Sequence, residues 1–574
     1  MITGAELLCH VLEEKGVTCV FSVPGTQTLA LHEALRRSRI RVVLATDELA
    51  ASFMANGYYR ASGRIAPLVT NSGPGFTYTL TGLAEALYDS AAVLYIVGVT
   101  PSAVPGQQPQ VLDQRAVARP LVKGCRRIDR AEDIPTAVGE SLALALGGEP
   151  GPVLLECAAE TLAGDASPMS AAESISVEGL DDGVVERVAT SIGAAHKPLL
   201  LAGQGCAAFS ERLQELAELV GAPVVTTASA RGVLPEDHPL ALSLDSVRTT
   251  AETARELFRN ADRVIVVGCK QDETFHLDLP AEHLVRVDTS LATLGSRDAA
   301  HVSIAAPAEA FFAAVIPAVR RLHRPGVSSW SPAEVEAWRH KLRADVADAE
   351  PLVHGALPAT AAAFFSALRA ALPREGIVVA DSGLHQILLR RHFDVLANRG
   401  LLFPGKFQAM GFGLPAAIGA QLAAPTRPVV ALIGDGGFAM SGLAILTAVR
   451  EKIPLTLVVF ADGFLNYIRV SQFARYGHAA HVDLVNPDFA LFAAAVGARY
   501  ARCSTDAEAV LRDAIGSGGV TVVEVPVGDS KAIHLSRIRG LARDAVPRTV
   551  GARWSEVLLG IARRLRRARK GRRE

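Results

Sequence analysis

Short apolar runs rich in Val, Ile and Leu alternate with longer stretches at helical spacing along the whole chain. This alternation is typical of parallel sheets that are covered by helices on both faces. It predicts an α/β protein built of doubly wound parallel sheets. The predicted strands are Val17–Ser22, Arg41–Ala45, Pro67–Thr70, Val93–Val97, Val153–Glu156, Pro198–Ala202, Pro223–Thr227, Val264–Val267, Gly376–Ala380, Val429–Ile433, Thr456–Phe460 and Val520–Val525.

Two stretches without apolar periodicity interrupt the pattern, at residues 163–179 and 323–333. Small, polar segments of this kind are typical of linkers. They predict an N-terminal domain over residues 1–162, a central domain over 180–322 and a C-terminal domain over 354–540, followed by a tail over 541–574. The first and third blocks share a comparable strand order without obvious sequence repetition.

The composition narrows the class of function. The chain has 574 residues and a net charge of −1, so no overall field favours nucleic acid or an anionic membrane. No apolar run approaches the roughly 20 residues of a membrane span. Seven scattered cysteines and an acidic N-terminal segment without an export signal predict a cytoplasmic protein. The last twelve residues carry eight basic groups and one acid, which indicates a solvated or frayed end more than a binding arm.

A weak motif lies in the central domain. The segment 203–208 (GQGCAA) follows a predicted strand and is a degenerate form of the dinucleotide fingerprint. The next strand ends in Thr226 and Thr227, where a nicotinamide site needs an acid for the ribose. A tight strand-to-helix turn is therefore the favoured interpretation.

A stronger motif follows the predicted strand Val429–Ile433. Gly434, Asp435, Gly436 and Gly437 form a turn in which a backbone can approach a phosphate group. Alone, Asp435 could simply cap a helix. However, Asp462 follows the next strand, 27 positions later. Acids at the carboxyl ends of adjacent parallel strands converge, and two carboxylates beside a diphosphate suit Mg²⁺.

These residues resemble the thiamine diphosphate binding motif, and the resemblance extends along nearly the whole chain to the acetolactate synthase-like branch of that family. The matching segments are 21–25 (FSVPG), 71–75 (NSGPG), 152–155 (PVLL), 381–386 (DSGLHQ) and 409–417 (AMGFGLPAA). The resemblance implies pyrimidine-binding, central and diphosphate-binding domains. It also implies a homodimer or homotetramer in which two subunits share each active site.

Specific roles follow from the resemblance alone. It makes Asp435, Asp462 and the Phe464 carbonyl ligands of Mg²⁺. It gives Met410 the role of an apolar prop for the cofactor, and the Gln408 carbonyl that of an acceptor for the aminopyrimidine. The cofactor-binding set it implies is Gly383, Leu384, His385, Gln408, Met410, Gly434, Asp435, Gly436, Gly437, Asp462, Phe464 and Leu465.

Two catalytic candidates come from the N-terminal block. The family alignment puts the glutamate that protonates the pyrimidine ring at Glu48, which follows a strand and begins an amphipathic helix. An acid there could instead complement the helix dipole, a role that Asp47 fits better. Gln110 resembles the family glutamine that faces the reacting carbon, although a glutamine in a proline-rich loop is by default a surface residue.

The resemblance implies cleavage of a 2-oxo acid substrate, giving an enamine that is protonated or added to a second carbonyl compound. Three positions differ from the acetolactate synthase pattern in places where relatives bind substrate or flavin. Ser471 replaces a tryptophan, and Ala159 lies in the segment where relatives usually have a lysine. Residues 268–272 lack an Arg-Phe-Asp run, which argues against FAD. Two alternatives stay open. One is a 2-hydroxyacyl-CoA lyase or oxalyl-CoA decarboxylase, and the other is a non-catalytic subunit that retained the fold.

Overall fold

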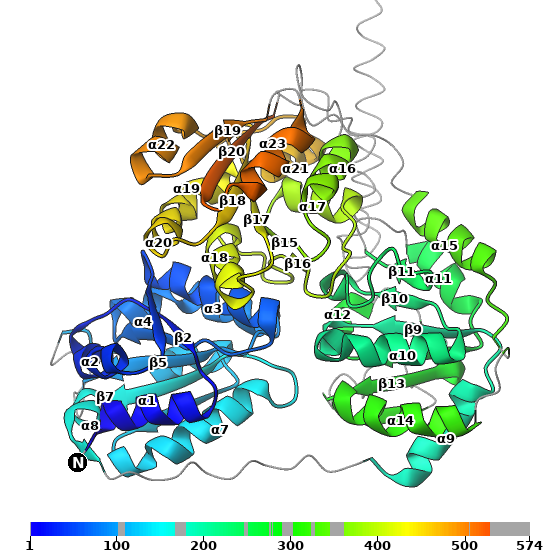
Figure 1. Ribbon diagram of the computed structural model, residues 1–574, viewed down its shortest axis with the longest axis horizontal. Coiled ribbons are helices and arrows are strands. Elements are labelled where there is room, and N and C mark those ends of the chain that lie inside the picture. The colour runs from blue at the N-terminus through cyan, green and yellow to red at the C-terminus, as the bar shows by residue number, and fades with distance from the viewer. Residues whose placement is uncertain are drawn as a thin grey trace, which may run out of the picture. The chain divides into compact units, whose positions relative to one another are not determined.

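The computed structural model of the chain describes residues 2–100, 109–166, 180–245, 251–274, 277, 279, 281–289, 302–322, 326, 328–344, 361–503 and 506–527. These residues contain three six-stranded parallel sheets, with helices between successive strands (Figure 1). The predicted α/β class with three doubly wound parallel-sheet domains is confirmed. The predicted basic tail lies outside the described residues.

The N-terminal sheet has the strand order β3-β2-β4-β5-β7-β6. Alternate residues face opposite sides: Phe21 and Leu68 lie in one apolar core, whereas Val20 and Val69 lie in another. This is how a parallel sheet buries both faces. The elements are β1 (Ile2–Thr3), α1 (Gly4–Glu14), β2 (Cys19–Ser22), α2 (Leu29–Arg37), β3 (Arg41–Leu44), α3 (Glu48–Ser62), β4 (Leu68–Asn71), α4 (Pro74–Tyr78), α5 (Leu80–Tyr88), β5 (Leu94–Val99), α6 (Gln114–Ala118), β6 (Gly124–Ile128), α7 (Ile134–Leu146), β7 (Val153–Ala158), α8 (Ala159–Ala163) and β8 (Asp165–Ala166).

The central sheet has the order β11-β10-β9-β12-β13-β14, which is typical of dinucleotide-binding sheets. Its two faces are covered by separate apolar cores. The elements are α9 (Asp182–Gly193), β9 (Pro198–Ala202), α10 (Ser210–Val220), β10 (Val224–Thr226), β11 (Ala241–Ser243), α11 (Ala251–Arg259), β12 (Arg263–Val267), α12 (Gln271–Thr274), β13 (Leu284–Asp288), β14 (Val302–Ala305), α14 (Ala308–Leu322) and α15 (Pro332–Ala344).

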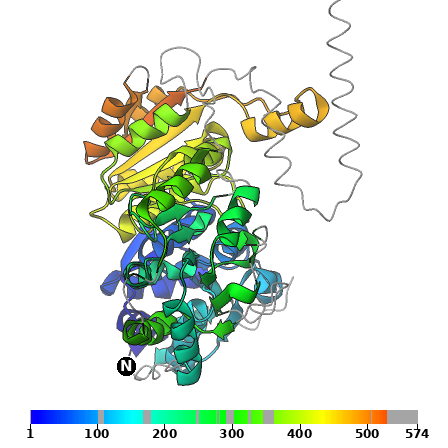
Figure 2. The same cartoon turned by 90° about the vertical axis from the view of Figure 1, so that its right-hand side faces the viewer.

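The C-terminal sheet has the order β16-β15-β17-β18-β20-β19. Counted along the chain, this repeats the order of the N-terminal sheet, and its strands lie between helices in the 90° view (Figure 2). The elements are α16 (Ala361–Ala371), β15 (Ile377–Ala380), α17 (Leu384–His392), β16 (Leu401–Leu402), α18 (Gly413–Ala423), β17 (Val429–Gly434), α19 (Asp435–Ser441), α20 (Ile445–Arg450), β18 (Leu455–Ala461), α22 (Phe489–Val496), β19 (Arg499–Arg502), α23 (Ala507–Gly516) and β20 (Val520–Pro526).

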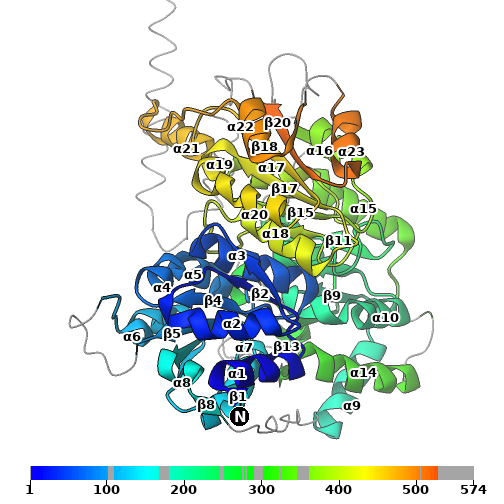
Figure 3. The same ribbon diagram turned by 60° about the vertical axis from the view of Figure 1, so that its left-hand side comes forward.

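Helices α3 and α18 join the N-terminal and C-terminal sheets through one shared apolar core (Figures 1 and 3). Their backbones approach closely because glycine lies at the contact. A Cβ on Gly57 would lie 2.0 Å from the Ala416 carbonyl oxygen, and one on Gly419 would lie 2.0 Å from that of Met54. Only glycine permits this spacing.

The chain divides into two units. The first comprises residues 1–464 and 484–530, and the second comprises 465–483 and 531–574. In the described part of the second unit, α21 (Asn466–Tyr476) ends at Gly477 in the left-handed conformation, and the Leu465 amide donates to the Val482 carbonyl at 2.8 Å.

The predicted strands do not include β1, β6, β8, β11, β13, β14, β16 and β19, and for three of these the reason is clear. β6 and β19 are edge strands with arginines among four or five residues, so they lack an apolar run. β16 has only two residues. After β17, α19 starts directly at Asp435, and a 3₁₀ turn at Gly442–Ala444 separates it from α20.

Candidate functional site

In both outer sheets the strand order reverses direction between the first and third strands along the chain, β2 and β4 in one and β15 and β17 in the other. Ligands of open α/β sheets bind at the carboxyl ends of such strands. The predicted site residues cluster at these two places. The C-terminal cluster contains segments that follow β15, β16, β17 and β18, and the N-terminal cluster contains segments that follow β2, β3, β4 and β5.

Asp435 organises the end of the C-terminal sheet. It is only 2% exposed, and its Oδ2 accepts from the backbone N–H groups of Asp462 at 3.1 Å and Gly463 at 2.6 Å. The structure therefore brings Asp435 and Asp462 together, as the argument from adjacent strands predicts. Asp462 Oδ1 in turn accepts from the Phe464 N–H at 2.9 Å.

Asn486 completes this arrangement. Its Nδ2 donates to Asp435 Oδ2 at 2.9 Å. Sequence reasoning missed Asn486, because the residue lies 51 positions after Asp435 in a segment with no motif. By contrast, among the described residues Asp435 Oδ1 accepts from the N–H of Gly436 alone, which leaves a lone pair for a cation.

The carboxylates of Asp435 and Asp462 suit a Mg²⁺ ion that is bound together with a phosphate-containing ligand. No cluster of three or more His, Cys, Asp or Glu side chains able to hold a metal occurs among the described residues. Mg²⁺ commonly uses one or two carboxylates together with phosphate oxygens and water. Asp435, Asp462 and a backbone carbonyl such as that of Phe464 fit this requirement, and their role as ligands stays a prediction.

The turn after β15 forms an anion cradle beside Gly434. His385 is buried, its ring stacks on Phe460, and its Nε2 has no hydrogen-bond partner. Burial lowers the pKa of His385 to about 4, so the ring is neutral near pH 7 and can donate one N–H. Gly383 lies at φ +150° at the N-terminus of α17. A phosphate at this helix end would accept from the free helix amides, and it would also accept from His385 Nε2 in the tautomer that carries the ring proton on that nitrogen.

The segment that carries Gln408 and Met410 lies beside this cradle. Asp381, which follows β15, is fully buried and accepts from the N–H groups of Gly411 at 2.9 Å and Phe412 at 3.1 Å. Burial raises the pKa of Asp381 to about 6. A Cβ on Gly411 would touch Met440 of α19 at 3.3 Å. The segment is therefore held between the ends of β15 and β17.

Asp381 also explains one of the predicted glycines. A Cβ on Gly437 would lie 1.9 Å from Asp381 Oδ2. Position 437 is glycine because the buried Asp381 carboxylate fills the space that a side chain would need, whether or not a ligand binds there.

Glu48 is the first residue of α3 in the N-terminal cluster. The N-cap is Asp47, whose Oδ1 accepts from the Ala50 N–H at 2.7 Å, so Asp47 has the capping role. The partly buried Glu48 carboxylate points elsewhere: Oε1 lies 3.1 Å from the place that a Cβ on Gly75 would occupy. Glu48 is thus left available for chemistry at the end of β4.

Three side-chain amides converge near Glu48. Gln110 Oε1 accepts from Asn71 Nδ2 at 3.0 Å and from Gln27 Nε2 at 3.3 Å. The Gln27 backbone N–H donates to Asn71 Oδ1 at 2.9 Å. Gln110 itself has φ +65°, a conformation that costs a non-glycine residue about 1 kcal/mol or more and that clusters at functional sites.

This network fixes the orientation of Gln110. Because Oε1 is held by two donors, Nε2 is directed away from them, and it makes no hydrogen bond within the described residues. The cluster thus presents neutral donors to a carbonyl or carboxylate oxygen. No signal in the sequence linked Gln27, Asn71 and Gln110, because the contacts join segments 39 to 83 positions apart.

Within the described residues Glu48 makes no hydrogen bond or ion pair with the segments around Asp381, Gln408 or Asp435. Leu465 and Ser471 belong to the second unit, so the predicted cofactor contact of Leu465 stays a prediction.

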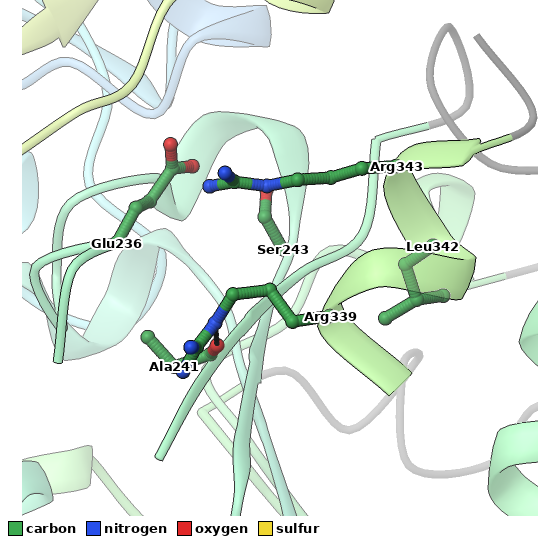
Figure 4. A pocket seen from close by; sticks show the side chains of 6 residues that line it. All are labelled: Glu236, Ala241, Ser243, Arg339, Leu342 and Arg343. Carbon is green, nitrogen blue, oxygen red and sulfur yellow. Dashed lines mark hydrogen bonds between the residues drawn. The ribbon is translucent and has the colours of Figure 1, made fainter. Parts of the chain in front are cut away.

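The described residues of the central domain form no comparable site. Gly203 and Gly205 pack against Gly268: a Cβ on Gly203 would lie 2.1 Å from the Gly268 carbonyl oxygen. The glycines therefore serve a tight backbone contact, in agreement with the favoured interpretation of segment 203–208. A small pocket at Glu236 and Arg339 is braced by the Arg339 Nε bond to the Ala241 carbonyl at 3.2 Å, and it contains none of the predicted site residues (Figure 4).

No helix in the described part of the chain is long and apolar enough to cross a membrane. All seven cysteines are free, and six of them are buried.

Three models of thiamine pyrophosphate enzyme domains match the chain in order. The N-terminal TPP binding domain matches residues 2–117, the central domain residues 185–315, and the C-terminal TPP binding domain residues 381–525. The two outer matches contain the two clusters described above.

Similar curated proteins cover almost the whole chain. The large subunit of acetolactate synthase isozyme 1 from Escherichia coli is 28% identical over 93% of this chain and 95% of its own length. Acetolactate synthase from Mycobacterium bovis is 30% identical over 89% and 85%. A probable 2-ketoarginine decarboxylase from Pseudomonas aeruginosa is 31% identical over 91% and 94%.

Proposed function

Because the chain belongs to the thiamine pyrophosphate enzyme family, whose members act on carbon–carbon bonds, we propose that it is a Mg²⁺-dependent enzyme that cleaves a 2-oxo acid next to the keto group. The product is then protonated or joined to a second carbonyl compound. The observation that carries the proposal is the convergence of Asp435, Asp462 and the His385 cradle at the carboxyl ends of β15, β17 and β18.

The diphosphate-binding cluster would hold the cofactor in two parts. Asp435, Asp462 and the Phe464 carbonyl would bind Mg²⁺, and the cradle of Gly383, Leu384, His385, Gly434, Gly436 and Gly437 would receive the diphosphate. The orphan Nε2 of His385 supports this fit. Gln408 and Met410 would contact the organic rings.

When bound, thiamine diphosphate supplies a carbon nucleophile and an electron sink for the broken bond. The chain's own residues would supply the proton and select the substrate. Glu48 would hold the proton that activates the pyrimidine ring, since its carboxyl is partly buried and Asp47 has taken over the capping role. Gln110 would donate from Nε2 to the oxygen of the substrate.

The substrate pocket is expected to be polar but uncharged. Around Glu48, the donors of Gln27, Asn71 and Gln110 are amides, and none is cationic. A neutral donor binds a carboxylate less tightly than a cation does. The bound substrate is therefore stabilised less against the loss of its carboxylate as CO₂. This supports a decarboxylation step before either outcome.

We propose that two copies of the chain share each site, because within the described residues Glu48 forms no hydrogen bond with the diphosphate-binding segments of its own chain. A homodimer or homotetramer would supply the missing contact. The free, buried cysteines support a reducing compartment, the cytoplasm.

The test begins with binding. Titration of the purified protein with thiamine diphosphate should give saturable heat with Mg²⁺ and much less with a chelator present. Incubation of the loaded protein with 2-oxo acids, singly and in pairs, followed by mass spectrometry, separates simple decarboxylation from ligation. Absence of cofactor binding would reject the proposal and favour a non-catalytic subunit. A dependence on coenzyme A thioesters would favour the lyase alternative.

A further inference from the structure

Glu85 is a buried acid that the proposed function does not use. It lies on α5 of the N-terminal domain and is 0% exposed. Its Oε2 accepts from the backbone N–H of Ala409 at 2.8 Å, a contact between residues 324 positions apart. Its Oε1 is buried and has no hydrogen-bond partner. Within the described residues, the hydrogen bond of this side chain is thus to the segment between Gln408 and Met410.

The hydrogen bond from the Ala409 N–H to Glu85 also fixes the direction of the preceding carbonyl group. The Ala409 N–H and the Gln408 carbonyl belong to the same peptide group, which is planar and trans. In such a group the C=O points opposite to the N–H. The Gln408 carbonyl therefore points away from Glu85, and no described residue donates a hydrogen bond to it.

The flanking residues are anchored separately. Gln408 has φ +63°, and its Nε2 donates to the Pro404 carbonyl at 2.7 Å. Asp381 holds the N–H groups of Gly411 and Phe412. Neither anchor touches the Ala409 N–H, so the tilt of this peptide group depends on Glu85.

The surroundings of Glu85 favour the neutral acid. Burial raises the pKa of Glu85 to about 8, and the nearby Asp89 and Asp381 act in the same direction, whereas the Ala409 N–H and Arg60 oppose it. Arg60 is already paired with Asp89 at 2.7 Å and donates to the Phe403 carbonyl. A neutral carboxyl accepts one N–H without placing a third negative charge in this core.

We propose that Glu85 is a positioning residue that orients the Gln408–Ala409 peptide group, so that the Gln408 carbonyl accepts a hydrogen bond from the amino group of the cofactor's pyrimidine ring. The proposal rests on the proposed function, because that assigns the carbonyl its ligand. Glu85 itself touches neither cofactor nor substrate in this role.

The experiment compares Glu85→Gln, which keeps an acceptor of the same length, with Glu85→Leu, which removes it, and Glu85→Asp, which shortens its reach. Hydrogen–deuterium exchange of peptides covering 404–412 in the cofactor-free protein reports the Ala409 bond. Calorimetry with Mg²⁺ and either thiamine diphosphate or inorganic pyrophosphate reports the two halves of the cofactor site.

We expect Glu85→Leu and Glu85→Asp to speed exchange at Ala409 and to weaken thiamine diphosphate binding roughly tenfold, the value of one hydrogen bond. Pyrophosphate binding should stay unchanged, because the diphosphate cradle lies beyond the peptide group. Glu85→Gln should match the parent protein in all three measurements.

Equal exchange in the parent and both the Leu and Asp variants would overturn the proposal, as would a parallel loss of pyrophosphate binding. A Gln variant as impaired as the Leu variant would also overturn it. If Glu85→Leu does not fold, the Asp and Gln variants decide. If the parent protein binds no thiamine diphosphate, the proposed function fails, and the exchange measurement alone then decides whether Glu85 holds the peptide.

Discussion

The Asp435 carboxylate accepts the Gly463 backbone N–H at 2.6 Å, and this bond ties the turn after β18 to the turn after β17. Asp435 thus has a structural role in addition to its proposed metal role. Loss of the side chain would free both turns. The two roles can be separated, because only one of them depends on the metal.

We predict that Asp435→Asn abolishes the Mg²⁺ dependence of cofactor binding. The amide is isosteric but uncharged, so it loses the charge that a hard cation needs. Calorimetry with thiamine diphosphate should show weak heat that Mg²⁺ no longer increases. Asn486→Ala is the matched control: it removes one donor to Asp435, costs about 1 kcal/mol of stability, and keeps the Mg²⁺ dependence. A normal Mg²⁺ response in Asp435→Asn would contradict the assignment.

Glu48→Gln should slow the exchange of the C2 proton of bound cofactor by roughly 10²–10⁴-fold, since glutamine cannot transfer a proton. Cofactor affinity should stay close to that of the parent. The exchange is followed by NMR after acid quenching in D₂O. For comparison, Asp47→Ala removes the cap of α3 and should cost about 1 kcal/mol of folding stability without a comparable change in exchange. Unchanged exchange in the Glu48 variant would remove this residue from the mechanism.

Gln27→Ala should loosen Gln110, because it deletes one of the two donors that hold Gln110 Oε1. We expect KM for the 2-oxo acid to rise roughly tenfold or less, since one hydrogen bond is lost, while cofactor affinity is unchanged. Gln110→Ala should have the larger effect and shift the ratio of aldehyde to ligated product in the mass spectrometric assay. Identical kinetics in the parent and both variants would place the amide cluster outside the substrate pocket.

The pH dependence of stability should report Glu85. The pKa of its folded form is raised from 4.5 to about 8, so the native state binds a proton that the unfolded chain has released. The contribution of the neutral acid to the free energy of unfolding is fully present below pH 4.5 and is lost as the pH rises toward 8. The slope is at most about 1.4 kcal/mol per pH unit. Denaturant titrations between pH 5 and 8 should therefore show a steeper decline for the parent than for Glu85→Gln. Parallel curves would contradict the raised pKa.

Gly57→Ala should destabilise the contact between α3 and α18. The new Cβ would lie 2.0 Å from the Ala416 carbonyl, and such overpacking typically costs about 1–3 kcal/mol. Gly139→Ala in α7 is a suitable control, because no atom lies within 4 Å of its Cβ position, and it should stabilise by about 0.5–1 kcal/mol. Thermal unfolding measures both changes. Equal stability of the Gly57 variant and the parent would show that α3 and α18 can move apart without loss of folding stability.

The sequence by itself determined the local chemistry. The apolar runs predicted the central strands, because a strand buried on both faces has to be apolar throughout. The pairing of Asp435 with Asp462 could also be predicted, since adjacent parallel strands end at one edge. The resemblance assigned the catalytic role to Glu48, and Asp47 was the better candidate for a role at the helix start, where it caps α3.

Contacts between distant segments were decided only by the tertiary structure. Asn486 reaches Asp435, two amides hold Gln110, and Glu85 reaches Ala409, yet no local pattern in the sequence links the members of any of these contacts. The edge strands β6 and β19 stayed hidden for the same reason, because their stability comes from pairing with a neighbour and not from their own composition. Periodicity records which face of an element is buried, whereas the partner across that face is set by the packing of the whole chain.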